Sequence, residues 1–173
     1  MERFGGLGLS ANQLGLNYRV FVMRTADSGI KAFFNPEITK LSQETELLKE
    51  GCLSLPDIYL MIKRPSAIEL EYSDAENERH TLQLEGLGSR CVQHELDHLN
   101  GIIFLQRASR FKIERALKAR PKERQKRINF ENTPDAAGFT LPFNVPKSTI
   151  PKVYPLPPEE TTASVILLPT TSI

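Results

Sequence analysis

The chain has 173 residues, of which 40% are hydrophobic and 25% charged, and its formal net charge at pH 7 is +1. That length is enough for one domain with its own core, and the near-neutral balance excludes a uniformly basic or acidic protein. No apolar run resembles a signal peptide or a membrane span. Together with only two cysteines, these features predict a soluble, cytoplasmic protein with reduced thiols and no membrane partner.

The first half of the chain predicts an antiparallel sheet. A glycine-rich stretch at the N-terminus leads into residues that favour helix. The segment 46–56 is apolar and mixed, and Pro56 is expected to end it. Strands joined by polar turns are expected at 18–25, 31–39, 66–74 and 79–86. Strands that follow one another in this way are typical of antiparallel pairing.

The hydrophobic period changes to that of a helix after Gly86-Leu87-Gly88. One helical face would carry Val92, Leu96, Leu99 and Ile103. Gly101 is expected to loosen the end of this helix. A second, basic helix is expected over 108–119, until Pro121 interrupts it.

The composition divides the chain into a folded part and a tail. One domain is predicted over residues 1–130, including the basic helix. Eight of the twelve prolines lie between 134 and 169. Residues 131–173 are therefore predicted to form a proline-rich tail, partly extended or disordered, that adds little core. Its apolar run 163–168 would add an edge strand or dock on the domain.

Residues 107–127 form a basic block, with ten Lys or Arg against two Glu, a local net charge of +8. The rest of the chain is then about −7. A block of this kind binds a polyanion or forms a solvated helix face, and the sequence alone leaves both readings open.

The stretch CVQHELDHL, residues 91–99, contains the pattern H-E-x-x-H. On a helix, residues four apart lie one turn above each other, so His94 and His98 can point at one metal ion. Glu95 can then reach a water on that ion without being a ligand. Because the apolar residues lie on the opposite side of the same helix, the pattern predicts a metal site rather than a chance match.

A hydrolytic metal site needs a third protein ligand. In the longer zinc-protease pattern H-E-x-x-H-x-x-G-x-x-H this ligand would fall at Phe104, which cannot bind metal, so that class is excluded. Glu114 and Glu123 lie inside the basic block, where Lys and Arg are the expected partners. His80 is interpreted as an ordinary histidine on a strand.

The cysteines are the remaining candidates. Cys91 is three residues before His94 and shares its helical face, so it could reach the ion or line the site. Cys52 follows Gly51 in an extended segment, where glycine permits close approach or unusual backbone angles. Spacing alone does not choose between the two cysteines.

Three stretches taken together resemble, in order and spacing, the motifs of the peptide deformylases: GLGLSANQ (6–13), EGCLS (50–54) and QHELDH (93–98). The resemblance covers about residues 4–119. It implies an α+β fold with antiparallel β-sheets packed around a central helix that bears H-E-x-x-H. It also implies metal-dependent hydrolysis of the N-terminal formyl group from N-formylmethionyl peptides of nascent proteins, which releases formate.

The resemblance assigns roles residue by residue. The metal ligands would be Cys52, His94 and His98. Glu95 would be the general acid and base, while the Gln13 amide and the Leu53 backbone N–H would stabilise the oxyanion. Gly8 would hydrogen-bond the substrate backbone. The pocket for the first side chain of the substrate would be formed by Leu7, Leu48, Glu50, Gly51 and Cys91. Arg64 and Asp97 would pair and brace the helix.

The resemblance also implies a cofactor and partners. Fe²⁺ is the expected metal, with Zn²⁺, Ni²⁺ or Co²⁺ as alternatives, because thiolate and imidazole ligands suit these ions. In relatives a basic C-terminal helix helps the enzyme to dock on the ribosome, and residues 107–127 match that element. A monomer is expected.

The chain departs from the usual family pattern at three places. Ser10 stands where alanine is usual, and its similar volume predicts little effect. Arg90 stands where an aliphatic residue commonly borders the pocket, although its stem can still line the wall. Only five residues precede Gly6, so the chain resembles a short form without the usual N-terminal segment, a fragment, or a sequence with a late start. The alternatives to a deformylase are a catalytically weak homologue that binds metal or ribosome and a zinc endopeptidase.

Overall fold

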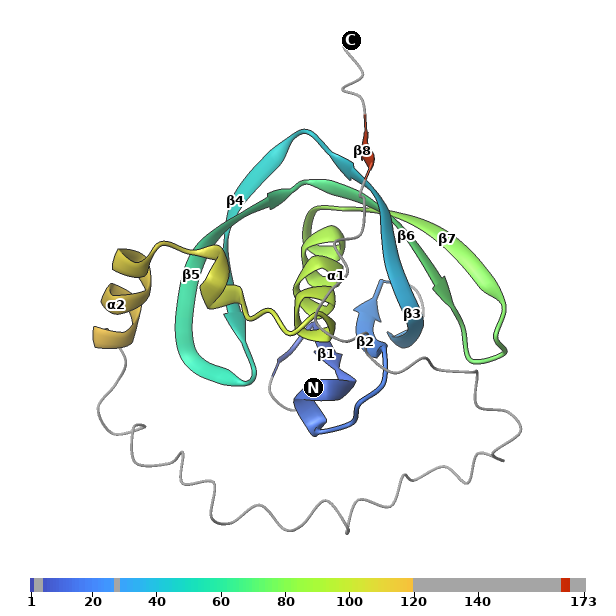
Figure 1. Cartoon of the computed structure of the whole chain (residues 1–173), viewed down its shortest axis with the longest axis horizontal. Coiled ribbons are helices and arrows are strands. Elements are labelled where there is room, and N and C mark those ends of the chain that lie inside the picture. The colour runs from blue at the N-terminus through green and yellow to red at the C-terminus, as the bar shows by residue number, and fades with distance from the viewer. Residues whose placement is uncertain (2–4, 27–28, 120–165, 169–173) are drawn as a thin grey trace.

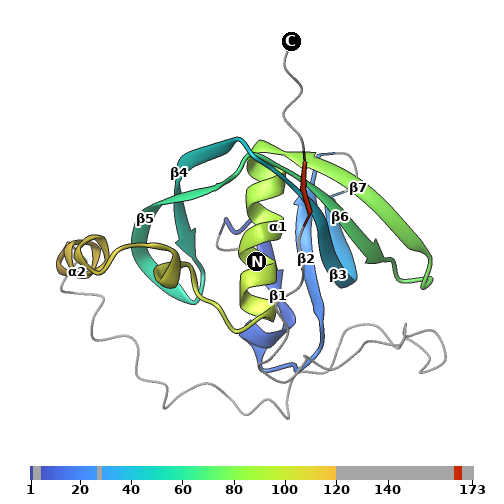
Figure 2. The ribbon, with the colours of Figure 1, turned by 45° about the horizontal axis from the view of Figure 1, so that its top comes forward.

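The structure is a computed structural model that describes residues 1, 5–26, 29–119 and 166–168. Helix α1 (Gly86–Leu99) lies in the middle of the fold, with antiparallel strands on both sides of it (Figure 1, Figure 2). The predicted α+β architecture around the H-E-x-x-H helix is therefore confirmed. Among the described residues, no helix is both long and apolar enough to cross a membrane.

The larger sheet has six strands within the described part of the chain, in the order β1-β2-β3-β6-β7, with β8 beside β3. Its strands are β1 (Gly8–Ser10), β2 (Val20–Thr25), β3 (Gly29–Ser42), β6 (Ala67–Ser73), β7 (Arg79–Glu85) and β8 (Ile166–Leu168). All neighbours pair antiparallel except β8, which pairs parallel with β3. The four strands predicted in this sheet are confirmed. The helix-friendly stretch after β1 is the short 3-10 helix η2 (Ala11–Leu14).

The smaller sheet is the hairpin of β4 (Thr45–Cys52) and β5 (Leu55–Pro65). The expectation that Pro56 ends the extended segment is wrong, because Pro56 is the second residue of β5. The pairing register shifts between Gly51 and Cys52, and Asp57 has a positive φ of 64°. Proline has no backbone N–H to donate to a neighbouring strand. Because the pairing is irregular where β5 begins, no regular hydrogen bond between the strands is lost there.

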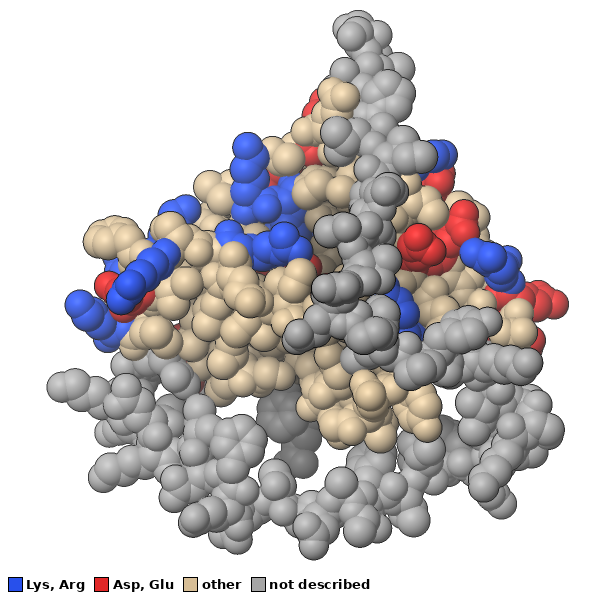
Figure 3. All heavy atoms as spheres, in the orientation of Figure 1, with Lys and Arg blue, Asp and Glu red and all other residues tan. Residues whose placement is uncertain are grey.

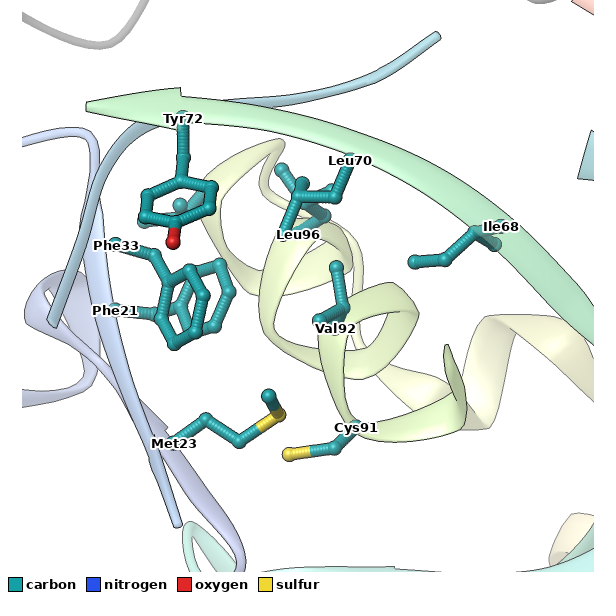
Figure 4. Packing of buried hydrophobic residues seen from close by; sticks show 10 residues of the cluster. Phe21, Met23, Phe33, Ile68, Leu70, Tyr72, Cys91, Val92 and Leu96 are labelled. Carbon is teal, nitrogen blue, oxygen red and sulfur yellow. The ribbon is translucent and has the colours of Figure 1, made fainter. Parts of the chain in front are cut away.

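The main core lies between α1 and the larger sheet (Figure 4). The Phe21 and Phe33 rings stack with centroids 4.9 Å apart, and Tyr72 lies 4.7 Å from Phe33. Val92 and Leu96 reach this cluster from α1. The apolar side of the helix is thus buried against the sheet, which leaves the side with the histidines for chemistry.

The helix ends earlier than its apolar period suggests. Asn100 is the C-cap, Gly101 has φ 72°, and the Ile102 N–H donates to the Asp97 carbonyl at 2.8 Å. This is the Schellman arrangement, in which glycine takes the left-handed conformation. Ile103 therefore lies outside the helix, so the expectation that it continues the helical stripe is wrong.

The chain beyond α1 returns to the β4–β5 hairpin. The 3-10 helix η3 (Phe104–Arg107) leads into α2 (Arg110–Lys118), which confirms the predicted basic helix. Helix α2 packs on β5 through Ile113 and Ala116, next to the buried ring of Phe104. The predicted tail 131–173 lies outside the described residues except for β8. This strand pairs with β3, which agrees with the first of the two alternatives for the apolar run 163–168, an added strand.

Candidate metal centre

Three potential metal ligands converge where β4 ends beside α1. Cys52 is the last residue of β4, whereas His94 and His98 lie one turn apart on α1. The Cys52 Sγ is 3.2 Å from the His98 Nε2, and the potential ligand atoms of all three residues lie within 4.8 Å of one another. One thiolate and two imidazoles form a donor set that fits a divalent transition metal with one position left for water.

The electrostatics of the site distinguish the two cysteines. Burial opposes ionisation of Cys52, but hydrogen bonds from His94 and His98 outweigh it and lower its pKa to about 5. Burial also opposes the charge on His94, but its contacts with Cys52 and Glu50 raise its pKa to about 9. By contrast, burial and the charge of Glu95 raise the pKa of Cys91 above its ordinary range. Cys52 is thus the thiolate of the site, and Cys91 stays a thiol.

Glu95 directly follows His94 on α1, beside the three potential ligands. Its side chain is 3% exposed, and burial is the largest influence that raises its pKa. The Ser10 hydroxyl and the two histidines act in the opposite direction. A carboxyl group with a raised pKa is suited to take up and return a proton near neutral pH.

Gln13 and Leu53 approach the potential ligands from two different elements, the 3-10 helix η2 and the turn after β4. The Gln13 Nε2 is 3.6 Å from the Cys52 Sγ and donates to the Ser54 hydroxyl at 2.9 Å. Leu53 lies in the turn between β4 and β5, and both residues line the same cleft as His94. The two residues predicted to stabilise the oxyanion therefore both line the cleft that Cys52 and His94 reach.

The structure brings most of the predicted pocket residues together. The cleft is lined by Leu7, Gly8, Glu50, Gly51 and Cys91, and also by Arg90 and the exposed Leu87 and Tyr59. Leu48 is outside this lining: it is half-buried on β4, opposite Ile62 of β5.

Gly8 is needed because β1 lies very close to α1. A Cβ atom at this position would come within 2.5 Å of a Glu95 carboxylate oxygen and 2.8 Å of the Cys91 sulfur. A contact under 3.0 Å forces something to move, so any larger residue would displace the strand or the carboxylate.

A chain of buried ion pairs supports the ligands. Arg64 of β5 donates to Glu50 at 2.7 Å and to Asp97 at 2.8 Å, so the predicted Arg64–Asp97 pair is present. Arg90 of α1 adds a second cation on Glu50 at 2.5 Å, and Arg107 adds a second cation on Asp97. Burial favours the neutral form of Glu50, but hydrogen bonds from His94, Arg64 and Arg90 outweigh it and hold its pKa at about 2.

Glu50 connects this network to the metal ligands. Its Oε2 lies 3.3 Å from the Nδ1 of His94, so the carboxylate can hold the imidazole ring in place. A hydrogen bond to the second ring nitrogen commonly fixes the tautomer and orientation of a metal-binding histidine.

Two of the contacts that were not predicted from the sequence involve Ser10 and Arg90. One is the bond between Ser10 and Glu95, and the other is the set of bonds made by Arg90, which also donates to the carbonyls of Ile62 and Glu46. Both positions had been noted as departures from the usual family pattern. The unusual residue types at these positions indicated a difference from other family members, but the local sequence did not predict that Glu95 and Glu50 would be the partners.

The alternative ligands have other partners. The Phe104 ring is buried against β5, with its centroid 5.9 Å from that of His94. Glu114 pairs with Arg110 at 2.9 Å on the surface of α2, and His80 contacts Asp74 at 2.5 Å. Glu123 lies outside the described residues. The described alternatives therefore do not join the cluster.

Two histidines and a buried glutamate on a helix held between antiparallel sheets, with a cysteine from the neighbouring strand, define the class of the protein as a metal-dependent hydrolase. The family model described as polypeptide deformylase matches residues 1–114. The peptide deformylase of Wolbachia pipientis wMel is 44% identical over 125 residues, which cover 65% of this chain and 70% of that relative.

Solved structures agree with this match. The peptide deformylase of Thermotoga maritima is 42% identical, with a TM-score of 0.60 over 63% of this chain and 74% of that one. That of Ehrlichia chaffeensis in complex with actinonin is 38% identical, with a TM-score of 0.65 over 74% of this chain and 77% of that one. The chain belongs to the peptide deformylase family, a family of metalloenzymes, and removes N-terminal formyl groups from nascent peptides.

The thiol chemistry gives a direct test of the ligand assignment. In the metal-free protein, iodoacetamide at about pH 7 should alkylate Cys52 and leave Cys91 unmodified, because only a thiolate is nucleophilic. The rate at Cys52 should fall as the pH falls through about 5, since its pKa is lowered to that value. Peptide mass mapping gives the result. Prior loading with Zn²⁺ should protect Cys52, and preferential modification of Cys91 would contradict the assignment.

The ion-pair chain predicts a contrast between two arginines. Arg90→Met removes a buried cation from Glu50 and should lower the free energy of unfolding by about 3 kcal/mol. The Arg107 side chain is 45% exposed, so Arg107→Met should cost less than about 1 kcal/mol. Urea unfolding of both variants, followed by circular dichroism at equal metal content, measures the difference. Equal costs would show that Arg90 is not a structural anchor.

Proposed function

We propose that Cys52, His94 and His98 together hold one divalent cation, and that Fe²⁺ is the native metal. The observation that carries the proposal is the approach of these three side chains to the buried Glu95 at one end of the cleft. The lowered pKa of Cys52 supports it, because a thiolate is already present at neutral pH. Thiolate and imidazole favour Fe²⁺, Co²⁺, Ni²⁺ or Zn²⁺ over Mg²⁺ and Ca²⁺.

A divalent cation bound there supplies a water acidic enough to lose its proton near neutral pH. Glu95 would accept a proton from that water on its carboxylate and would later deliver a proton to the departing amine. Its burial favours the protonated form between these two steps. General acid and base catalysis of this kind contributes about 10² to 10⁴ in rate.

The negative charge that develops on the formyl oxygen in the transition state needs hydrogen-bond donors to stabilise it. We assign the Gln13 Nε2 and the Leu53 backbone N–H to this role. The side-chain oxygen of Gln13, Oε1, accepts a hydrogen bond from the Ser10 backbone N–H at 2.9 Å. This bond directs the side-chain nitrogen of Gln13 toward the proposed ligands. Each such donor is worth about 3 kcal/mol in the transition state.

The cleft next to the ligands would take the first side chain of the substrate. Leu7, Gly8 and Cys91 would form its wall on the β1 side, and Glu50 and Gly51 its wall on β4. In this proposal the Gly8 backbone pairs with the peptide. The Arg90 stem contributes to the pocket wall while its guanidinium is occupied with Glu50, so its presence does not place a free charge in the pocket.

The ribosome is the proposed docking partner, through the basic helix α2. Figure 3 shows Lys and Arg side chains at the end of the molecule where α2 lies. Lys112, Arg115 and Lys118 are exposed on this helix, whereas Arg110 is paired with Glu114. Such side chains bind the phosphates of ribosomal RNA without sequence preference. The monomeric state and the cytoplasmic location stay predictions from the sequence.

The catalytic assignment predicts the behaviour of one variant. Protein prepared anaerobically with Fe²⁺ should deformylate formyl-Met-Ala-Ser, and Glu95→Ala should lower kcat by about 10² to 10⁴ because the proton carrier is lost. The release of formate measures the rate. Equal rates in parent and variant would contradict the role of Glu95, and a parent without turnover would favour the non-catalytic alternative.

Metal content is the control for this experiment. Cys52→Ala should lose the metal because it removes a ligand, whereas Cys91→Ala should keep it. Elemental analysis of both proteins after gel filtration gives the ratio. Retained metal in Cys52→Ala together with loss in Cys91→Ala would reverse the ligand assignment.

The docking proposal predicts an effect that depends on salt. The double variant Lys112→Glu/Arg115→Glu should sediment with ribosomes less than the parent at about 50 mM salt, and the difference should shrink at about 200 mM. The matched control is Lys63→Glu/Arg79→Glu, which reverses two exposed charges on strands. Both variants should keep the parental kcat on the short peptide. Equal sedimentation of both double variants would contradict docking through α2.

A further inference from the structure

Ser10 is fully buried at the junction of β1 and η2, directly against α1. Its hydroxyl oxygen lies 2.5 Å from the Oε2 of Glu95 and 3.0 Å from the backbone carbonyl oxygen of the same residue. Both acceptors therefore belong to the proposed proton carrier. The volume of the side chain predicts little effect of serine in place of alanine, but volume does not account for this pair of contacts.

The backbone of the same residue acts on the other side of the site. The Ser10 N–H donates to the Gln13 Oε1 at 2.9 Å. The amide nitrogen of Gln13 then points at the Ser54 hydroxyl, with the Cys52 sulfur 3.6 Å away. One residue thus contacts both the carboxylate that would move the proton and the amide that would bind the oxyanion.

The two oxygens of the Glu95 carboxylate are in different surroundings. Oε2 faces the Ser10 hydroxyl, whereas Oε1 lies next to Gly8, 2.5 Å from the position that a Cβ on this residue would occupy. Gly8 lines the cleft. Oε2 is therefore the oxygen that is hydrogen-bonded to Ser10, and Oε1 is the oxygen next to a residue that lines the cleft.

We propose that Ser10 is a positioning residue for the deformylation reaction. Its hydroxyl anchors the Oε2 of Glu95, so that Oε1 faces the substrate and carries the proton. This inference rests on the proposed role of Glu95. Alanine at this position would keep the backbone bond to Gln13 and lose only the anchor of the carboxylate, so the substitution separates the two contacts.

A loosely held carboxylate would still be present in the site but would less often be in the reactive orientation. Misplacement of a catalytic group by about 1 Å lowers the rate of the chemical step by up to about 10²-fold. The binding of the peptide does not use the Ser10 hydroxyl. The effect should therefore appear in kcat and leave KM unchanged.

The test compares Ser10→Ala with Ser89→Ala in the Fe²⁺-loaded protein. Ser89 is an equally buried serine on α1, and its hydroxyl bonds to Gln93 and to the Pro65 carbonyl, away from Glu95. Ser10→Ala should lower kcat about tenfold with KM within about twofold of the parent. Ser89→Ala should keep both constants, and the two variants should have equal metal content.

A second measurement keeps the inference testable if either variant is unstable. High-resolution crystal structures should show one Glu95 carboxylate orientation in the parent and in Ser89→Ala, and a rotated or split carboxylate in Ser10→Ala. An unchanged kcat and an unchanged carboxylate in Ser10→Ala would overturn the inference. Equal losses of kcat in both serine variants would assign the effect to general packing and would overturn it as well.

Glu95→Gln separates this inference from the proposed function on which it rests. If Glu95→Gln keeps the parental rate, the proton carrier has been misassigned and both proposals fail. If Glu95→Gln is inactive while Ser10→Ala keeps the parental kcat, only the role of Ser10 fails.

Discussion

The carboxylate of Glu50 accepts hydrogen bonds from two arginines inside the protein, Arg64 of β5 and Arg90 of α1. The Arg90 bond joins the β4–β5 hairpin to the central helix, and Arg64 joins the two a second time through Asp97. Cys52 follows two residues later on β4, and His94 follows one helical turn after Arg90. The proposed ligands come from β4 and from α1, so the distance between Cys52 and the two histidines depends on how firmly these elements are joined here.

Such a network is expensive to build, because each buried charge loses its hydration. This loss is offset because every buried charge has more than one partner. Arg64 donates to both Glu50 and Asp97, and each of these carboxylates accepts from a second arginine. An apolar replacement of the whole set would be able to match its stability. It would not hold the His94 ring through the Glu50 Oε2, which explains why charged residues occupy this buried position.

Much of the fold could be predicted from the sequence, because hydrophobic period is a local property. The strands 66–74 and 79–86 and the central helix were predicted in this way, and α2 from its basic composition. Strand β5 was missed because Pro56 suggested an end. Its outward positions also include apolar residues, Tyr59 and Met61, which hide the alternation with the buried Ile58 and Leu60.

The residues of the candidate site that lie in sequence motifs could be predicted, whereas the contacts between distant residues could not. The H-E-x-x-H pattern identified two ligands by helical spacing alone, whereas Cys52 required the family resemblance. The contacts of Ser10 with Glu95 and of Arg90 with Glu50 join residues 85 and 40 positions apart. No local pattern encodes such pairs, because they exist only once β1 and β4 lie against α1.

The two cysteines show how the fold decides what spacing left open. Both lie in the cleft region, and Cys91 is much the nearer to the histidines in sequence. The side of α1 that carries Cys91 faces Met23 and the core (Figure 4), where a thiolate would be desolvated beside the carboxylates of Glu95 and Glu50. Cys52 instead meets two imidazoles that stabilise its charge. The same functional group is therefore suited to bind a metal at Cys52 and stays an unreactive part of the cleft wall at Cys91, and the cause is the charge around each thiol rather than its distance along the chain.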